Sequence, residues 1–97
     1  IDGKVGTQNI DTLSNLHLAT NLLITDLTGI EDFTSLYYLN CLGCLNLTTI
    51  NLTQNHFLNY LDFSETQISS IDLTQNTALT ILRCFNNPQL NSIEIQL

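Results

Sequence analysis

The stretch LYYLNCLGC, residues 36–44, decides the fold because its spacing of apolar residues occurs four times along the chain. The spacing is L-x-x-L-x-L, with Cys41 taking the third apolar position in this copy. The four copies begin at Leu13, Leu36, Leu58 and Leu79, so their starts lie 23, 22 and 21 residues apart. A fixed period of this length predicts a solenoid, in which each unit packs only on its neighbours.

The position three residues after the third apolar residue sharpens this pattern. It holds only short side chains that can bond the backbone where the chain turns off a strand: Asn21, Cys44, Thr66 and Asn87. A second row of apolar residues follows each of these turns and ends, in two copies, at Asn55 and Asn76. We expect those two asparagines to stack as a buried ladder, because each amide can bond the backbone of its own and the adjacent coil.

The segments between the turns predict strands and not long helices. Apolar residues alternate with polar ones in the second row, at 47–52, 68–73 and 90–95, which is the period of a strand. Residues 24–33 differ, since their apolar side chains recur every three residues and predict a 3₁₀ or short helical segment. Each coil is therefore expected to carry a strand on one side and a weaker strand or 3₁₀ turn on the other.

These spacings, with Asn, Cys or Thr at the turn, resemble the leucine-rich repeat over nearly the whole chain. The segment ITDLTGIEDF resembles the convex part of internalin-type repeats, and the later "IDLTQN" and "LDFS" resemble short repeats of secreted and surface proteins from the Bacteroidetes. The resemblance implies a β-rich, right-handed solenoid of about four turns, with a parallel sheet on its concave side. It also implies an extracellular or cell-surface location and a role in binding.

The repeat frame divides the chain into an N-terminal partial cap and four repeats. The cap is expected at residues 1–12, and the repeats at 13–35, 36–57, 58–78 and 79–97. The last residues, IEIQL, stop partway through a coil without a polar cap, although solenoid ends need one. We expect either a fragment of a longer protein or an end that docks on another copy.

Composition narrows the classes of partner. The 97 residues carry a net charge of −7, and only Lys4 and Arg83 are basic. Nucleic acid is therefore not an expected partner, because phosphate backbones are bound by clusters of Lys and Arg. No apolar run approaches the roughly 20 residues of a membrane-spanning helix, so membrane insertion is not expected either.

Residues that could suggest chemistry have simpler structural explanations. The chain contains a C-x-x-C pair, Cys41 and Cys44, but both positions belong to the repeat, and we expect them and Cys84 to be free structural thiols. The Asp2-Gly3 turn lacks the ligands of a calcium loop. His17 and His56 lie apart in the repeat frame. We expect no enzyme activity, no metal and no cofactor.

The exposed positions of the concave sheet are the candidate binding surface. Large side chains at nominally solvent-facing positions, with aromatic residues and Arg among them, are typical interface anchors. The alternative is that they cover one another as ordinary cross-strand pairs. The candidate residues are Tyr38, Asn40, Leu42, Tyr60, Asp62, Ile81, Arg83 and Phe85.

Two functions agree with these observations. The first is a non-catalytic recognition or adhesion module, part of a larger secreted or surface bacterial protein, that binds a protein or a glycan. The second is a structural spacer or a filament subunit that binds other copies of itself, which the low content of charged residues, 11%, favours.

Overall fold

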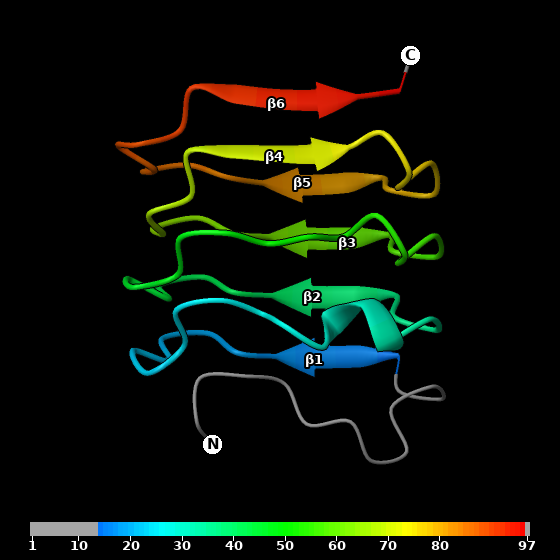
Figure 1. Ribbon diagram of the computed structural model, residues 1–97, viewed down its shortest axis with the longest axis horizontal. Helices are drawn as coiled ribbons and strands as arrows, with labels where there is room; N and C mark the ends of the chain where they lie inside the picture. Colours follow the sequence, from blue (N-terminus) through cyan, green and yellow to red (C-terminus); the bar gives the residue numbers. More distant parts are fainter. Residues whose placement is uncertain (1–13, 97) are drawn as a thin grey trace.

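The chain forms a stack of coils (Figure 1). Apolar side chains fill the space inside them. The computed structural model describes residues 14–96, with six strands and one short 3₁₀ helix in that range. The expected cap at residues 1–12, the Asp2-Gly3 turn and the first anchor, Leu13, lie outside the described residues.

One side of the stack is a four-stranded parallel sheet in the order β1-β2-β3-β5. The strands are β1 (Asn15–His17), β2 (Tyr38–Asn40), β3 (Tyr60–Asp62) and β5 (Ile81–Arg83). They pair in register, so that equivalent positions of successive repeats lie side by side in straight columns. This sheet is the predicted concave sheet, and its columns follow the spacing of the L-x-x-L-x-L copies.

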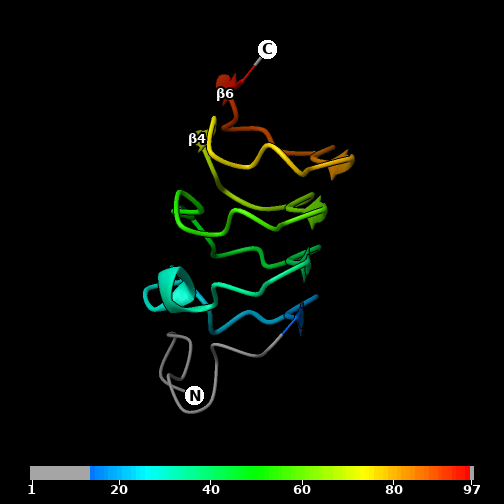
Figure 2. The same cartoon turned by 90° about the vertical axis from the view of Figure 1, so that its right-hand side faces the viewer.

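The opposite side of the stack is less regular (Figure 2). Strands β4 (Ser70–Leu73) and β6 (Ser92–Ile95) pair in parallel there, while the first coil carries the 3₁₀ helix Ile30–Asp32. The predicted second row of strands is thus present in the later coils, as β4 and β6. Residues 47–52, in the coil between the 3₁₀ helix and β4, form no strand. The coil before residues 47–52 carries the 3₁₀ helix and the coil after them carries β4, so these residues lie between two different local structures.

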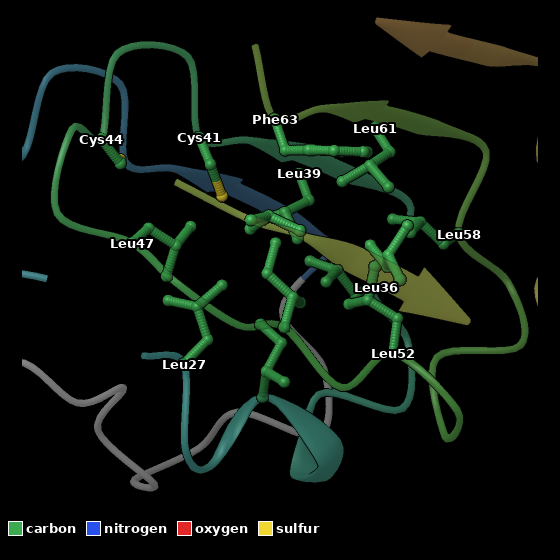
Figure 3. Close-up of a cluster of buried hydrophobic side chains, with 14 of the residues drawn as sticks. Leu27, Leu36, Leu39, Cys41, Cys44, Leu47, Leu52, Leu58, Leu61 and Phe63 are labelled. Carbon is green, nitrogen blue, oxygen red and sulfur yellow. The ribbon is translucent and has the colours of Figure 1, made fainter. Parts of the chain in front are cut away.

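The core lies between the two sides and consists of columns of aliphatic and aromatic residues (Figure 3). Leu39 and Leu61 are fully buried, because each lies between two neighbouring strands. Leu82, the next residue in the same column, is 36% exposed, since no strand of the described residues lies beyond β5. One coil cannot bury its own apolar edge, so burial depends on the coil stacked on it.

Two buried asparagines, in the turns that precede β3 and β5, connect successive coils. The side-chain amide of Asn55 donates to the carbonyl oxygens of Ile30 and Phe33 at 2.9 and 3.0 Å. The amide of Asn76 donates in the same way to Leu52 and Asn55, both at 2.9 Å. The side-chain oxygens of both asparagines are buried without a hydrogen-bond partner among residues 14–96. The link between coils is therefore made by the amide donors.

The turns after the four-stranded sheet use three types of side chain at one position, Asn, Cys and Thr. Cys44 Sγ donates to the carbonyl of Leu18 in the preceding coil at 2.9 Å, and Thr66 Oγ1 donates to the carbonyl of Phe63 in its own coil at 3.0 Å. Asn87 donates to Cys84 and accepts from the backbone N–H of Thr66. The side-chain oxygen of Asn21 accepts from the N–H of Leu23. Each member thus bonds backbone at the turn.

The residue before each of these positions has a left-handed backbone. The φ angles are 61° for Thr20, 76° for Gly43, 58° for Glu65 and 58° for Asn86. Glycine adopts this conformation freely, whereas a Cβ costs about 1 kcal/mol or more there. The turn geometry is therefore imposed by the stacking of the coils and not by local preference at Thr20 and Glu65. The arrangement as a whole confirms the expected fold class, a β-rich solenoid of about four turns.

Replacing Asn55 with Ala should lower the free energy of unfolding by about 2–3 kcal/mol, because two buried carbonyls lose a donor and a small cavity forms. Urea denaturation measures the change. Asn46→Ala is the matched control, since Asn46 also donates to a carbonyl of the preceding coil, Leu22, but at an exposed site. Equal losses in the two variants would contradict the buried ladder.

Replacing Glu65 with Gly should raise the free energy of unfolding by about 0.5–1 kcal/mol, because it removes the steric cost of a Cβ at positive φ. Thermal and urea denaturation measure the gain. Glu65→Ala removes the same charge and keeps the Cβ, so it should give no such gain. If both variants stabilise equally, the effect is one of charge and not of backbone conformation.

Candidate binding surface

The outward side chains of β1, β2, β3 and β5, and of the residue two beyond each strand, form a surface that we call the four-stranded face. Its first column consists of Asn15, Tyr38, Tyr60 and Ile81. Its second column consists of His17, Asn40, Asp62 and Arg83. Leu42 and Phe85 belong to a third column, just past the strands. The eight predicted residues thus lie on one face, because the strands pair in register.

Tyr38 and Tyr60 form the centre of this face. Their ring centroids are 4.5 Å apart with an interplanar angle of 11°, which is a stacked pair. The ring of His17 lies 4.8 Å from that of Tyr38, from the neighbouring strand on the other side. Adjacent strands are about 4.8 Å apart, so the rings fill the spaces between strands. The Tyr38 ring therefore has a neighbouring ring from the strand on each side, and its hydroxyl accepts from the side-chain amide of Asn40 at 3.4 Å.

Asp62 lies in the middle of the second column but is only 3% exposed. Its Oδ1 accepts from the backbone N–H of Ser64 at 2.9 Å, as Asn40 Oδ1 accepts from the N–H of Leu42 at 3.0 Å. Ser64 Oγ in turn accepts from the N–H of Phe85 at 3.1 Å. Asn40 and Asp62 therefore hold the ends of their own strands. Asp62, although predicted on the exposed face, is buried and has Arg83 as its ion-pair partner.

Arg83 is the exposed charge of the face. Its Nε lies 3.9 Å from Oδ2 of Asp62, and its side chain is 53% exposed. Its guanidinium carbon also lies 5.7 Å from the centroid of the Phe85 ring. An ion pair this long and this exposed contributes little stability. The two contacts nonetheless hold the guanidinium between a carboxylate and an aromatic ring. There its N–H groups can donate to an anionic or polar group of a partner.

Among the predicted residues, exposure is greatest at the β5 end of the face. Tyr38, Asn40, Leu42 and Tyr60 are half-buried, whereas Ile81 and Phe85 are 46% and 49% exposed. The largest accessible apolar area of the predicted set is thus at the β5 end, beside Arg83. The end of the sheet offers more contact surface than its centre, because no further strand covers it among the described residues.

The sequence interpretation missed large exposed apolar residues outside the predicted set. Leu22, Leu23 and Leu45 lie at the corner that follows the strands, and Tyr37 and Phe57 lie at the corner that precedes them. The sequence contains a sign of these residues, since each is an apolar residue directly beside a turn or anchor position. The alternation of apolar and polar residues predicts which strand residues face solvent, but it does not apply to the corners between strands.

The three cysteines are free thiols, and Cys41 and Cys44 are fully buried. The hydrogen bond with the Cys41 thiol lowers the pKa of Cys44 to about 7, burial opposes this shift, and the N–H of Asn21 adds to it. The pKa of Cys41 is raised well above its ordinary value by the same hydrogen bond, by burial and by the charges of Cys44 and Asp62. Neither thiol reaches solvent, and Cys44 bonds the backbone of the preceding coil at the turn.

No group of three or more His, Cys, Asp or Glu side chains is placed to hold a metal ion within residues 14–96. A hollow of about 240 Å³ lies on the opposite side of the stack, beside Asp26 and Glu31. Both carboxylates already accept backbone N–H groups, from Thr28 and Gly29. In the same range, no helix is long and apolar enough to cross a membrane.

A comparison with known proteins found a solved structure with a similar fold. No protein-family model and no curated protein matches the sequence. A solved structure, described as the functional domain of InlJ from Listeria monocytogenes that includes a cysteine ladder, superposes with a TM-score of 0.75 and 27% identity. The fold is that of a leucine-rich-repeat solenoid. The match covers 79% of this chain and 17% of that one, so this chain spans about a sixth of its length.

The packing of the face predicts an altered titration of Tyr60. Burial, the Asp62 carboxylate and Tyr38 raise the pKa of its phenol above the ordinary value of 10.0. The folded state then keeps a proton that the unfolded state loses, so stability should fall as the pH rises above about 10. Asp62→Asn should lower the pKa of Tyr60, which NMR titration of the ring carbons measures. The variant keeps the side-chain oxygen that accepts from the N–H of Ser64. An unchanged pKa of Tyr60 would show that the Asp62 carboxylate does not act on the phenol.

Proposed function

We propose that this chain is a non-catalytic protein-recognition module, of the adhesion type, within a larger secreted or cell-surface bacterial protein. The observation that supports it best is the orientation of the aromatic side chains on the four-stranded face. Tyr38 and Tyr60 stack on each other, so one face of each ring is covered by the other ring. This geometry favours a protein partner over a glycan.

A glycan is the less suitable partner for this face. Sugar rings bind by laying their C–H groups flat on an exposed aromatic face, and the faces of Tyr38 are occupied by His17 and Tyr60. A protein partner needs instead a mixed surface of tyrosine edges, an arginine and apolar anchors, which is the usual composition of interface centres. Arg83, Phe85 and Ile81 supply that mixture at the more exposed end.

The structural relative is consistent with this role without defining it. The similarity to a functional domain of InlJ supports a repeat module that can bind, and the resemblance to internalin-type and secreted bacterial repeats supports placement outside the cell. Half-buried tyrosines held by in-register strands are also pre-ordered, which reduces the entropy lost on association.

The test uses purified chain on two arrays, one of extracellular proteins and one of glycans, followed by measurement of Kd for any ligand. Tyr60→Ala and Phe85→Ala should each weaken protein binding at least about 30-fold, a hot-spot effect of about 2 kcal/mol. Ser70→Ala, an exposed change on the opposite side of the stack, is the control and should leave Kd unchanged. Circular dichroism checks that each variant is folded.

Binding to glycans alone would contradict the choice of a protein partner. Protein binding with an affinity that neither Tyr60→Ala nor Phe85→Ala changes would place the site outside the four-stranded face. The corner residues Leu22, Leu23 and Leu45 would then be the next surface to replace.

The alternative function is that of a structural spacer or a filament subunit built by stacking coils end to end. The exposed edge of β5 and the exposed residues Leu82 and Ile95 favour it, because they leave apolar area available at one end. A chain that remains monomeric in light scattering at millimolar concentration contradicts this alternative.

A further inference from the structure

The turn that follows β2 holds two cysteines, Cys41 and Cys44, whose side chains both belong to the core (Figure 3). The turn has the sequence Cys41-Leu42-Gly43-Cys44, and the N–H of Cys44 donates to the carbonyl of Cys41 at 3.1 Å. Such a hydrogen bond closes a turn whose first and last Cα atoms are less than about 7 Å apart. The turn therefore brings the two cysteines to the separation that a disulfide requires, about 4.4–6.8 Å between Cα atoms.

The two thiols are joined by hydrogen bonds that distinguish one sulfur from the other. The Cys44 thiol donates to the carbonyl of Leu18 in the preceding coil at 2.9 Å. The bond between the two thiols lowers the pKa of Cys44 and raises that of Cys41, and the N–H of Asn21 also lowers the pKa of Cys44. Cys44 is therefore the sulfur that loses its proton first, with the Cys41 thiol held against it. A nucleophilic thiolate beside a second thiol is the arrangement that thiol–disulfide exchange uses.

The backbone of this turn is held by the coils on both sides of it. The N–H of Thr20 donates to the carbonyl of Leu42 at 2.7 Å, and the N–H of Gly43 donates to the carbonyl of Ser64 at 3.0 Å. Gly43 has a φ of 76°, and a Cβ at that position would lie 3.3 Å from Cγ2 of Thr20. The stack thus fixes the turn while both sulfurs are reduced. The entropy of bringing the two cysteines together is lost when the protein folds, and not when a bond forms between them.

Cys84, the third thiol, does not have this geometry with either sulfur. It follows β5 as Cys41 follows β2, and β3, which is followed by Phe63, lies between those two strands. Two strand spacings separate the equivalent positions by about 9–10 Å, which exceeds the roughly 7 Å that a disulfide can bridge. Of the four coils, only the second has cysteine at both the third apolar position and the turn position. Cys41 and Cys44 are therefore the pair that the fold can join.

We propose that Cys41 and Cys44 form a redox-active dithiol, which a low-molecular-weight disulfide such as oxidised glutathione converts to an intramolecular disulfide. The Cys44 thiolate attacks one sulfur of the small disulfide, whose S–S bond breaks as one small thiolate leaves, and a mixed disulfide forms at Cys44. The Cys41 thiolate then attacks Sγ of Cys44, and the second small thiolate leaves. The two protons of the cysteines pass to the two leaving thiolates, so the protein loses two electrons and the small disulfide gains them.

Closing the disulfide changes how the turn is linked to the preceding coil. In the reduced protein the Cys44 thiol donates to the carbonyl of Leu18, and a disulfide has no S–H to donate. Oxidation therefore exchanges a hydrogen bond between coils for a covalent bond within one turn. Both sulfurs are buried, so the small disulfide reaches them during folding or when the coil opens locally.

The test unfolds the full chain in urea and refolds it in a mixture of reduced and oxidised glutathione, so that burial does not limit access to the sulfurs. Acid then stops the exchange, the free thiols are counted in denaturant, and mass spectrometry locates the bridge. Cys84→Ser removes the competing thiol and leaves the turn unchanged. This variant should lose both of its thiols and about 2 Da, the mass of two hydrogen atoms. Cys44→Ser is the matched control, because it keeps a hydroxyl donor for Leu18 and should form no bridge.

The folded Cys84→Ser chain should favour the disulfide at least about tenfold more than the same chain in urea at the same glutathione ratio, because the fold holds the two thiols together. An equal or smaller preference in the folded chain would overturn the proposal, and so would a stable mixed disulfide with glutathione in place of the bridge. A bridge to Cys84, in the unaltered folded chain or in the control, would also overturn it. These measurements involve no ligand of the four-stranded face, so failure here is distinct from failure of the proposed function.

Discussion

Each coil of this protein depends on its neighbour both to bury its leucines and to satisfy its backbone. Leu39 and Leu61 are fully buried only because strands lie on both sides of them, and Leu82 shows the exposure that results when one side is open. The amides of Asn55 and Asn76 add a polar form of the same dependence, since their donors belong to one coil and their acceptors to the one before. Stability is thus a sum of contacts between neighbours.

This dependence also creates the candidate binding surface. In-register pairing brings Tyr38 and Tyr60, which are 22 residues apart in the chain, to a ring separation of 4.5 Å. The same pairing places Asp62 between Asn40 and Arg83 in the next column, where Asp62 is buried. Recognition by such a surface therefore needs no separate loop or domain, because the strands that stabilise the coil also fix the orientation of the side chains turned to solvent.

Much of the fold could be predicted because the repeat is written into the spacing of apolar residues. The four anchor copies, the turn positions and the 3₁₀ segment all follow from periodicity, and the structure agrees with them. The second strand row was predicted for every coil from Leu47 onward, but only β4 and β6 form strands. Residues 47–52, between the coil with the 3₁₀ helix and the coil with β4, have the same apolar spacing and form no strand, so the local pattern does not decide where this second row forms.

The sequence by itself determined the solenoid, its direction of burial and the set of side chains on each face, because these follow from a period of two within strands and of about 22 between them. Only the tertiary structure decided what those side chains can do. It turned the faces of the tyrosines toward each other, withdrew Asp62 from solvent and left Arg83 and Phe85 accessible. Exposure and ring orientation depend on which residues of adjacent coils meet, and that is a property of the stack.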